Sequence, residues 1–358
     1  MINITNAAAI CNLGENLDEI FTNIIEGKIV DFKVSATLPV IDYDCYDIRC
    51  NRMLLHCINQ IKQDINELIK TYGKKRIGIA ISTTNTGIDN YENTGNAEFL
   101  KMSNPAEFVK KYLGLSGPYC GVSSACSSGI KVFSTAKKWL DSGLCDAVIV
   151  GGADEISKFP LAGFRALEVL SDKRSNPFSK HPTGINISEA AALFILKKNE
   201  TGIKVMGIGE TSDAYHASTP NPDGEEAANA MLQALHDAGM KPEEVDYINL
   251  HGTGTVANDT MEANAIYKVF GDRTPVSATK PLTGHCLGAS ASIETAICYA
   301  LLRNNSGFLP PHIYDGEYNP NITKINLVSK GTRVNTVNNV MCNAFGFGGT
   351  NAVIILGK

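Results

Sequence analysis

One cysteine and two distant histidines stand where reactive side chains are commonly placed. Cys126 lies in GVSSACSSGI, between a strand-like run and a helix-like segment. His251 follows the apolar VDYINL and opens HGTGT, and His285 lies in KPLTGHCLGAS, ahead of a long apolar helix pattern. A cysteine at a helix start faces unsatisfied backbone amides, so we expect its pKa to be lowered toward neutrality. Together the three residues indicate a nucleophile with proton-handling and charge-stabilising partners.

Each of these residues taken alone has a plainer interpretation. A free cysteine is often a small buried residue, and a single histidine is often a hydrogen-bonded core residue. A further glycine-rich segment, NAFGFGGTN at 343–351, precedes the closing strand-like AVIIL. The combination of these segments in one chain favours the interpretation as a site.

The chain resembles the β-ketoacyl-acyl carrier protein synthases, the type I/II condensing enzymes of the thiolase superfamily. The matching strings are SSACSSG, HGTGT with the following NDTME, KPLTGHCLGAS and NAFGFGGTN. Their order and spacing agree with the family from the segment after Arg76 to the C-terminus, and four ordered motifs are far more specific than one. The resemblance implies an α/β, thiolase-like fold with two sheets, in which two related βαβ halves stack as αβαβα.

The resemblance also implies a role for each matching residue. Cys126 would carry the acyl group as a thioester. His251 and His285 would meet the negative charge that develops on a malonyl thioester during decarboxylation. Lys280 would organise the surroundings of the histidines, although a lysine is most often a surface residue. Glu262 matches a supporting carboxylate.

The resemblance gives Phe347, inside GFGG, two functions. Its backbone amide and that of Cys126 would form the oxyanion hole, and its ring would act as a gate beside the acyl pocket, with the neighbouring glycines as a hinge. The plainer alternative is a core aromatic residue on a bend. Phe345 fits that core role better.

The implied reaction is the decarboxylative Claisen condensation of an acyl group on Cys126 with malonyl-acyl carrier protein. No cofactor or metal is expected, because the substrates are carried on the phosphopantetheine of acyl carrier protein. The second partner would be an identical subunit or a homologous chain-length-factor subunit. The short region before Cys126 and the segment NPFS…GINISEAAALF are most similar to those of condensing enzymes of aryl polyene pathways. These enzymes resemble type II polyketide systems.

Several alternatives remain open or are disfavoured by particular residues. Fatty-acid elongation is the main alternative pathway. A non-catalytic chain-length-factor-like subunit would lack the nucleophile, but Cys126 is present. A thiolase would need a second cysteine inside the glycine loop, and the only candidate, Cys342, lies just ahead of that loop. A type III synthase uses one histidine and an asparagine, and the pair of histidines argues against it.

Composition sets the broad class. The 358 residues are 44% hydrophobic, enough for a substantial core, and the net charge of −5 makes nucleic acid an unexpected partner. The ten cysteines include no CxxC pair, which favours reduced intracellular thiols over disulfides or zinc. No apolar run approaches the roughly eighteen residues of a membrane span, and no signal peptide is evident, so we expect a cytoplasmic protein.

Strand-like and helix-like segments alternate along the chain, which predicts βαβ units. The first half contains RIGIAIS, GPYCGVS, DAVIVGG and AALFIL, with a helix predicted over 53–72 and another after Cys126. The second half repeats this alternation. We therefore expect an N-terminal half at 1–200 that carries the nucleophile and a C-terminal half at 201–358 that carries both histidines, with a boundary at 199–202.

Two features depart from the family pattern. The chain is shorter than typical members, apparently before the nucleophile, so acyl specificity cannot be transferred. In NPFSKHPTGINISEAAALF, Pro182 and Thr183 replace the usual Arg-Asp, while Gly184 and Glu189 keep the outline. We expect an altered internal support beside intact catalytic residues.

Overall fold

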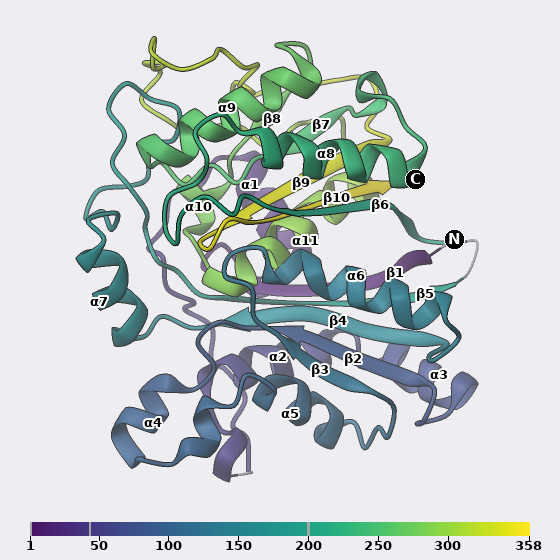
Figure 1. Ribbon diagram of the computed structural model, residues 1–358. Helices are drawn as coiled ribbons and strands as arrows, with labels where there is room; N and C mark the ends of the chain where they lie inside the picture. Colours follow the sequence, from purple (N-terminus) through teal and green to yellow (C-terminus); the bar gives the residue numbers. More distant parts are fainter. Residues whose placement is uncertain (1, 43, 199–200) are drawn as a thin grey trace.

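The computed structural model describes residues 2–42, 44–198 and 201–358 (Figure 1). Two of the residues at the expected boundary between the halves, 199 and 200, lie outside this description. The division of the chain at that boundary therefore stays a prediction.

The strands of the described chain form one mixed sheet with the order β3-β2-β4-β5-β1-β6-β10-β9-β7-β8. Their bounds are β1 Ile2–Cys11, β2 Ile77–Ser82, β3 Tyr119–Val122, β4 Ala147–Asp154, β5 Ala190–Lys198, β6 Ile203–Ser212, β7 Tyr247–Asn249, β8 Val276–Ser277, β9 Asn339–Gly346 and β10 Thr350–Gly357. In the first half, β2 is parallel to β3 and β4, and β5 is antiparallel to β4 and β1. The second half repeats this pattern with β7, β8, β9, β10 and β6. The two halves are therefore related in topology.

The expectation of two separate sheets is corrected by the contact between β1 and β6. These strands pair antiparallel at Asn3 with Lys204 and at Ile4 with Ile203, so the hydrogen-bonded ladder continues from one half to the other. Only these two residue pairs of the ten-residue strands β1 and β6 are joined, so the two halves meet at one end of these strands.

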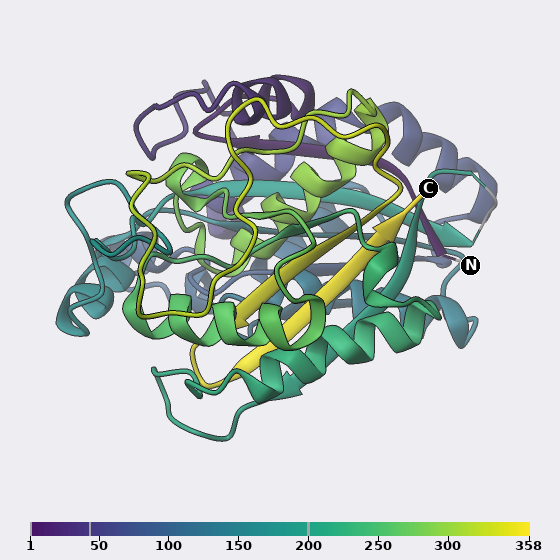
Figure 2. The same cartoon turned by 90° about the horizontal axis from the view of Figure 1, so that it is seen from above.

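Helices cover both outer faces of the sheet and fill the space between the halves (Figures 1 and 2). Their bounds are α1 Leu17–Ile25, α2 Arg49–Gln60, α3 Lys62–Tyr72, α4 Ile88–Thr94, α5 Asn104–Tyr112, α6 Ser128–Asp141, α7 Lys158–Ala166, α8 Glu225–Ala238, α9 Val256–Phe270, α10 Lys280–Thr283 and α11 Ser290–Asn304.

Alternation along the strands produces the layers. In β4, Val148 and Val150 join the central core with α6 and α11, whereas Ala147 and Ile149 join an outer core with α2, α3 and α5. Successive strand side chains point to opposite faces, so each half of the sheet is buried on both sides. The second half is covered on its outer face by α8 and α9. The expected αβαβα arrangement is confirmed.

Several elements differ from the sequence prediction. The helix predicted over 53–72 is divided at Ile61, whose φ of −114° and ψ of 21° interrupt the helical backbone between α2 and α3. Neither β1 nor α7 was predicted. β1 has asparagine and threonine in its first half and a run of alanines in its second, and α7 contains no buried residue, so neither has a strong hydrophobic period.

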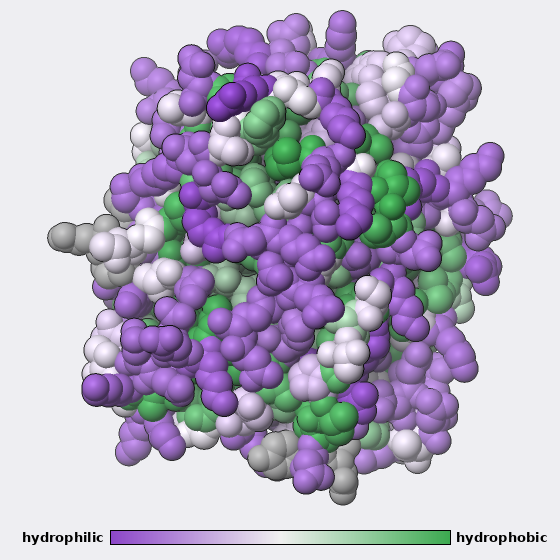
Figure 3. Space-filling model, turned by 180° about the vertical axis from the view of Figure 1, so that it is seen from behind, coloured by the Kyte–Doolittle hydropathy of each residue, from purple (hydrophilic) through white to green (hydrophobic). Residues whose placement is uncertain are grey.

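Among the described residues, no helix is both long and apolar enough to cross a bilayer. The face behind the view of Figure 1 is largely hydrophilic, with hydrophobic side chains in small separate groups (Figure 3).

Candidate active site

Cys126 lies in a tight turn between β3 and α6, residues 123–127, which we call the elbow. The preceding Ala125 has a φ of +52°, in the left-handed region that costs a non-glycine residue about 1 kcal/mol or more. Ser128 closes the elbow, because its Oγ accepts from the Ser124 N–H at 2.7 Å and donates to the Ala125 carbonyl at 2.6 Å. The cysteine is thereby held just before α6 and is 7% exposed, as the sequence predicts for a residue between a strand and a helix.

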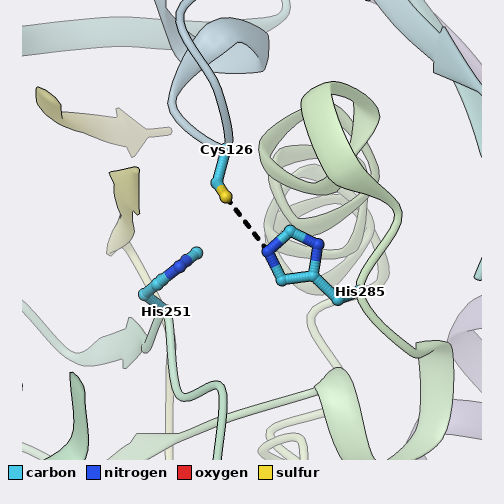
Figure 4. Close-up of side chains that lie close together, drawn as sticks. All are labelled: Cys126, His251 and His285. Atoms are coloured by element: carbon cyan, nitrogen blue, oxygen red, sulfur yellow. Dashed lines mark hydrogen bonds between the residues drawn. The ribbon is translucent and has the colours of Figure 1, made fainter. Parts of the chain in front are cut away.

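The structure brings both histidines to this cysteine (Figure 4). His285 Nε2 lies 3.1 Å from Cys126 Sγ, and the rings of His251 and His285 are 5.8 Å apart between centroids. His251 comes from the loop after β7, and His285 follows α10. A cysteine and two histidines that are far apart in the sequence thus form one cluster at the ends of three different elements.

Hydrogen bonds to Nδ1 fix the tautomer of each ring. The Leu287 N–H donates to His285 Nδ1 at 3.0 Å, and the Lys280 ammonium lies 3.2 Å from His251 Nδ1. A nitrogen that accepts a hydrogen bond carries no proton, so each neutral ring carries its proton on Nε2. The site therefore presents two imidazole N–H donors.

Both rings are neutral at ordinary pH. Burial lowers the pKa of His285 to about 3, and the nearby Lys280 charge acts in the same direction. Burial, then Lys280, also lower the pKa of His251 well below its usual value. The Nε2–H of each neutral ring can donate a hydrogen bond to an oxyanion.

Lys280 is the centre of a buried polar cluster. Its Nζ donates to the His251 carbonyl and to Glu294 Oε1, each at 2.6 Å, and the lysine and glutamate side chains are 2% and 1% exposed. Sequence reasoning missed Glu294, although it is the one carboxylate in the apolar pattern SASIETAICYALL. Burial raises the pKa of Glu294 to about 7 against the opposing effect of Lys280.

Glu262 holds the loop that carries His251. Its two carboxylate oxygens accept from the backbone N–H groups of His251 and Gly252, each at 2.7 Å. Asp259, which sequence reasoning quoted only as part of a motif, accepts from the N–H of Gly254 at 3.2 Å. Burial raises the pKa of both carboxyl groups, that of Asp259 to about 7. These acids orient backbone and do not reach Cys126.

The expectation of a lowered thiol pKa is wrong. Burial raises the pKa of Cys126 to about 11, and the opposing effects of Lys280 and of the backbone amides of Phe347 and Cys126 are smaller. The physical reason is that the pocket removes water from the sulfur, and loss of hydration disfavours a thiolate more than the helix start favours it. The resting side chain of Cys126 is a thiol.

The backbone amides of Cys126 and Phe347 both lower the pKa of the Cys126 thiol, so both lie close to its sulfur. The turn that carries Phe347 lies against the elbow: a Cβ on Gly346 would be 3.1 Å from the Cys126 nitrogen. Two backbone N–H groups from separate elements therefore converge near the reacting atom.

Phe347 lines two cavities beside Cys126. Its ring stacks on Phe164 with centroids 5.5 Å apart and planes at 23°. A cavity of about 150 Å³ contains both histidines, and a more apolar cavity of about 280 Å³ extends under α7; Cys126, Phe164 and Phe347 line both. Phe345 is 6% exposed and packs in the outer core, but it also lines the cavity that contains the histidines, with its ring 6.1 Å from that of His251.

The altered segment before β5 retains its anchors. The Thr183 hydroxyl donates to the Arg174 carbonyl at 2.9 Å, and Gly184 has a φ of +100°. Glu189 accepts from Arg49 Nη2 at 2.6 Å and from the Val34 N–H at 2.9 Å. These contacts of Thr183 and Glu189 hold the segment in this chain, and the expected change relative to the family pattern stays a prediction.

Ligating atoms of Cys126, His251 and His285 lie within 4.8 Å of one another, a spacing that a metal ion could also use. Metal coordination needs an imidazole lone pair, however, and the Nδ1 contacts leave Nε2 of each neutral ring as an N–H. The chemistry of the donor set fits an oxyanion better than a cation.

Comparisons with known proteins agree with this geometry. Residues 69–202 match the model for the β-ketoacyl synthase N-terminal domain, and residues 203–314 match that for the C-terminal domain. The chain is 31% identical to 3-oxoacyl-[acyl-carrier-protein] synthase 2 of Coxiella burnetii over 409 aligned positions, covering 99% of this chain and 98% of that protein. It is also 31% identical to nodulation protein E of Rhizobium leguminosarum bv. trifolii, covering 98% and 97%.

A solved structure is similar along its full length. The ketosynthase (ApeO) in complex with its chain length factor (ApeC) from Xenorhabdus doucetiae contains a chain that is 34% identical, with a TM-score of 0.94 and coverage of 99% of this chain and 97% of that one. With the two domain models and relatives matched over nearly their whole length, the chain belongs to the β-ketoacyl synthase family of acyl-transferring condensing enzymes.

Proposed function

We propose that this chain is a β-ketoacyl-acyl carrier protein synthase of an aryl polyene or related type II polyketide pathway. The observation that carries the proposal is the cluster of Cys126 with two neutral histidines, each presenting an Nε2–H. This donor arrangement suits a reaction that forms an enolate beside an acylated cysteine.

In the first half-reaction, Cys126 accepts the acyl group. The sulfur attacks the thioester carbonyl, the amides of Cys126 and Phe347 stabilise the tetrahedral oxyanion, and the carrier's thiolate leaves. The thiol proton of Cys126 ends on that leaving thiol, so one thioester is exchanged for another. His285 donates to the sulfur and has no free lone pair on Nε2 with which to act as its base.

In the second half-reaction, a malonyl thioester loses CO₂ and becomes an enolate. His251 and His285 donate their Nε2–H groups to the enolate oxygen, while its carbon attacks the acyl carbonyl on Cys126. The new carbon–carbon bond forms, the second tetrahedral oxyanion occupies the same amide hole, and the cysteine thiolate leaves and takes up a proton. Lys280 holds His251 in the required tautomer, and Glu262 and Glu294 hold the loop and the lysine.

The pathway assignment rests on the similarity to the ApeO–ApeC complex at 34% identity and a TM-score of 0.94. Fatty-acid elongation is the second candidate, because the Coxiella burnetii relative at 31% identity is a 3-oxoacyl-[acyl-carrier-protein] synthase 2. The intact Cys126 disfavours a non-catalytic chain-length-factor role. The starter that acylates Cys126 fastest would distinguish the two pathways.

The proposal includes the partners. The substrates arrive on the phosphopantetheine of acyl carrier protein, and no further cofactor is involved. The chain pairs with an identical or a homologous ketosynthase-fold subunit, by analogy with the ApeO–ApeC complex. Within the chain, 1–200 supplies the nucleophile and 201–358 supplies both histidines.

Intact-mass spectrometry tests the proposal. The protein is incubated with aryl, polyenoyl and saturated acyl-carrier thioesters, with and without a candidate partner subunit, and then with malonyl-carrier. We expect an acyl adduct that requires Cys126, is absent in Cys126→Ala, and disappears as the ketoacyl product appears. No adduct under any of these conditions would remove the catalytic assignment.

A further inference from the structure

The two halves of the oxyanion hole come from separate elements, and a chain of hydroxyl groups connects them. The amide of Cys126 belongs to the elbow before α6, and that of Phe347 belongs to the turn between β9 and β10. A hole of this kind works only when both donors keep their spacing to a fraction of an ångström. The residues that join elbow and turn therefore bear directly on acyl transfer.

Lys131, one turn into α6, reaches that turn from the elbow side. Its Nζ donates to Thr350 Oγ1 at 2.6 Å, and Thr350 is the first residue of β10. Thr350 Oγ1 lies 3.1 Å from Ser127 Oγ, and Ser127 Oγ donates to the Ser124 carbonyl at 2.8 Å. Ser124 and Ser127 flank Cys126 in the sequence, so the contacts run from the helix through the turn and back to the elbow.

The number of available protons fixes which group donates in each of these hydrogen bonds. Ser127 has a single hydroxyl proton, which it donates to the Ser124 carbonyl, so its oxygen must accept from the Thr350 hydroxyl. The Thr350 oxygen in turn accepts from the Lys131 ammonium. A charged donor at the head of such a chain polarises and strengthens the hydrogen bonds that follow.

The environment of Lys131 sets it apart from its neighbours on α6. Among the ion pairs of the described residues, Lys137 pairs with Asp141 and Asp237, whereas none involves Lys131. Lys131 is only partly exposed, and Lys138 of the same helix is exposed. The hydroxyl of Thr350, and not a surface carboxylate, is thus the partner that fixes the Lys131 ammonium.

We infer that Lys131 is a positioning residue for acyl transfer, which holds the Phe347 turn in register with the Cys126 elbow through Thr350 and Ser127. This inference rests on the proposed function, because it assigns the two amides to the tetrahedral intermediates on Cys126. Decarboxylation of malonyl thioester depends on the two histidines instead. Loss of the Lys131 contact should therefore separate the two activities.

The test variants are Lys131→Met, Thr350→Val and the double variant that combines these two changes. They are compared with the conservative variant Lys131→Arg and with the matched surface control Lys138→Met. The rate of acyl transfer to Cys126 is measured by intact mass, and malonyl-carrier decarboxylation is measured without an acyl donor. We expect acyl transfer to fall about 10-fold in each single variant, less than the roughly 100-fold or greater loss of a whole oxyanion donor. The double variant should be no slower than the singles, because both changes interrupt one chain.

Decarboxylation should stay within about twofold of wild type in these variants, and Lys131→Arg should restore most of the acyl transfer. Unfolding in urea identifies any variant that has lost stability. Equal losses of both activities, or acyl transfer at the wild-type rate in Lys131→Met, would overturn the positioning role while leaving the proposed function intact. A wild-type protein that neither accepts an acyl group nor decarboxylates malonyl-carrier would overturn both.

Discussion

At Cys126, burial and the helix start act on the thiol in opposite directions. The amides at the start of α6 favour a thiolate, yet loss of water around a side chain that is 7% exposed favours the thiol more strongly. A protonated thiol costs little here, because the carrier's leaving thiol takes up the proton at the end of the exchange. The same burial protects the cysteine from adventitious oxidation between turnovers.

The pH dependence of alkylation tests the raised pKa of about 11. The group is protonated below that value, so its thiolate fraction should rise about tenfold per pH unit from about pH 6.5 to about pH 9.5 without a plateau. The measurement is the rate of carboxamidomethylation of Cys126 by peptide mass mapping, with the urea-unfolded chain as the control for an ordinary thiol. A plateau below about pH 8.5, the ordinary pKa of a cysteine, would show that the helix start prevails.

Removal of the Lys280 ammonium should destabilise the fold. Lys280→Met leaves Glu294 buried without its 2.6 Å partner, and loss of one member of a buried pair costs about 3 kcal/mol. The double variant Lys280→Met/Glu294→Gln should recover part of this loss, because no unpaired carboxyl charge remains. Urea unfolding gives the free energies, and a double variant less stable than the single one would contradict the pair.

Removal of metal ions tests whether the cluster of Cys126, His251 and His285 works without a metal. Because Nδ1 of both rings accepts a hydrogen bond, each Nε2 remains an N–H, which in the proposed reaction donates to substrate. We expect condensation activity to be unchanged within about twofold after dialysis against a chelator, since no step of the proposed reaction uses a metal. A loss of activity that zinc or another divalent cation restores would require a different account of the cysteine–histidine cluster.

The sequence predicted several strands and the main site residues, but it did not reveal the features that depend on contacts between elements. Short apolar runs predicted β2, β4 and β5, and the motifs identified Cys126, His251 and His285 as candidates. The tautomers of the histidines were not predictable, because they depend on contacts with Leu287 and Lys280 that only the folded chain creates. The division between α2 and α3 and the link between β1 and β6 depend on packing, which overrides weak local preferences.

The close approach of α6 to α11 can be tested at Gly129. A Cβ on Gly129 would overlap the backbone nitrogen of Ser292, so Gly129→Ala should lower the free energy of unfolding by about 1–3 kcal/mol and slow acylation of Cys126. Gly163 in α7 has no atom within 4 Å of such a Cβ, so Gly163→Ala should raise stability by about 0.5–1 kcal/mol. Urea unfolding measures both, and a stable, active Gly129→Ala would contradict the tight packing.

For the whole molecule, α7 and α4 are the two described α-helices that bury no residue, and α7 is the one that lines a cavity at Cys126. It contains no buried residue, lies at the margin of the molecule in Figures 1 and 2, and exposes 64% of Phe159. The apolar cavity of about 280 Å³ that reaches Cys126 is lined by this helix. In the pairing proposed above, a second ketosynthase-fold subunit over α7 would close the cavity around the acyl chain and remove apolar surface from water.

A charge on α7 tests where that second subunit binds. Phe159→Glu should weaken dimer formation at least about tenfold, because the partner would have to bury an unpaired carboxylate, while the unfolding of the chain in urea should barely change at so exposed a position. Leu232→Glu is the matched control: Leu232 lies on α8, over the outer face of the second half, and is 47% exposed. Sedimentation equilibrium over a range of concentrations, alone and with a homologous partner, gives the association constants. Wild-type association in Phe159→Glu would place the partner elsewhere, and the open cavity would then need another closure.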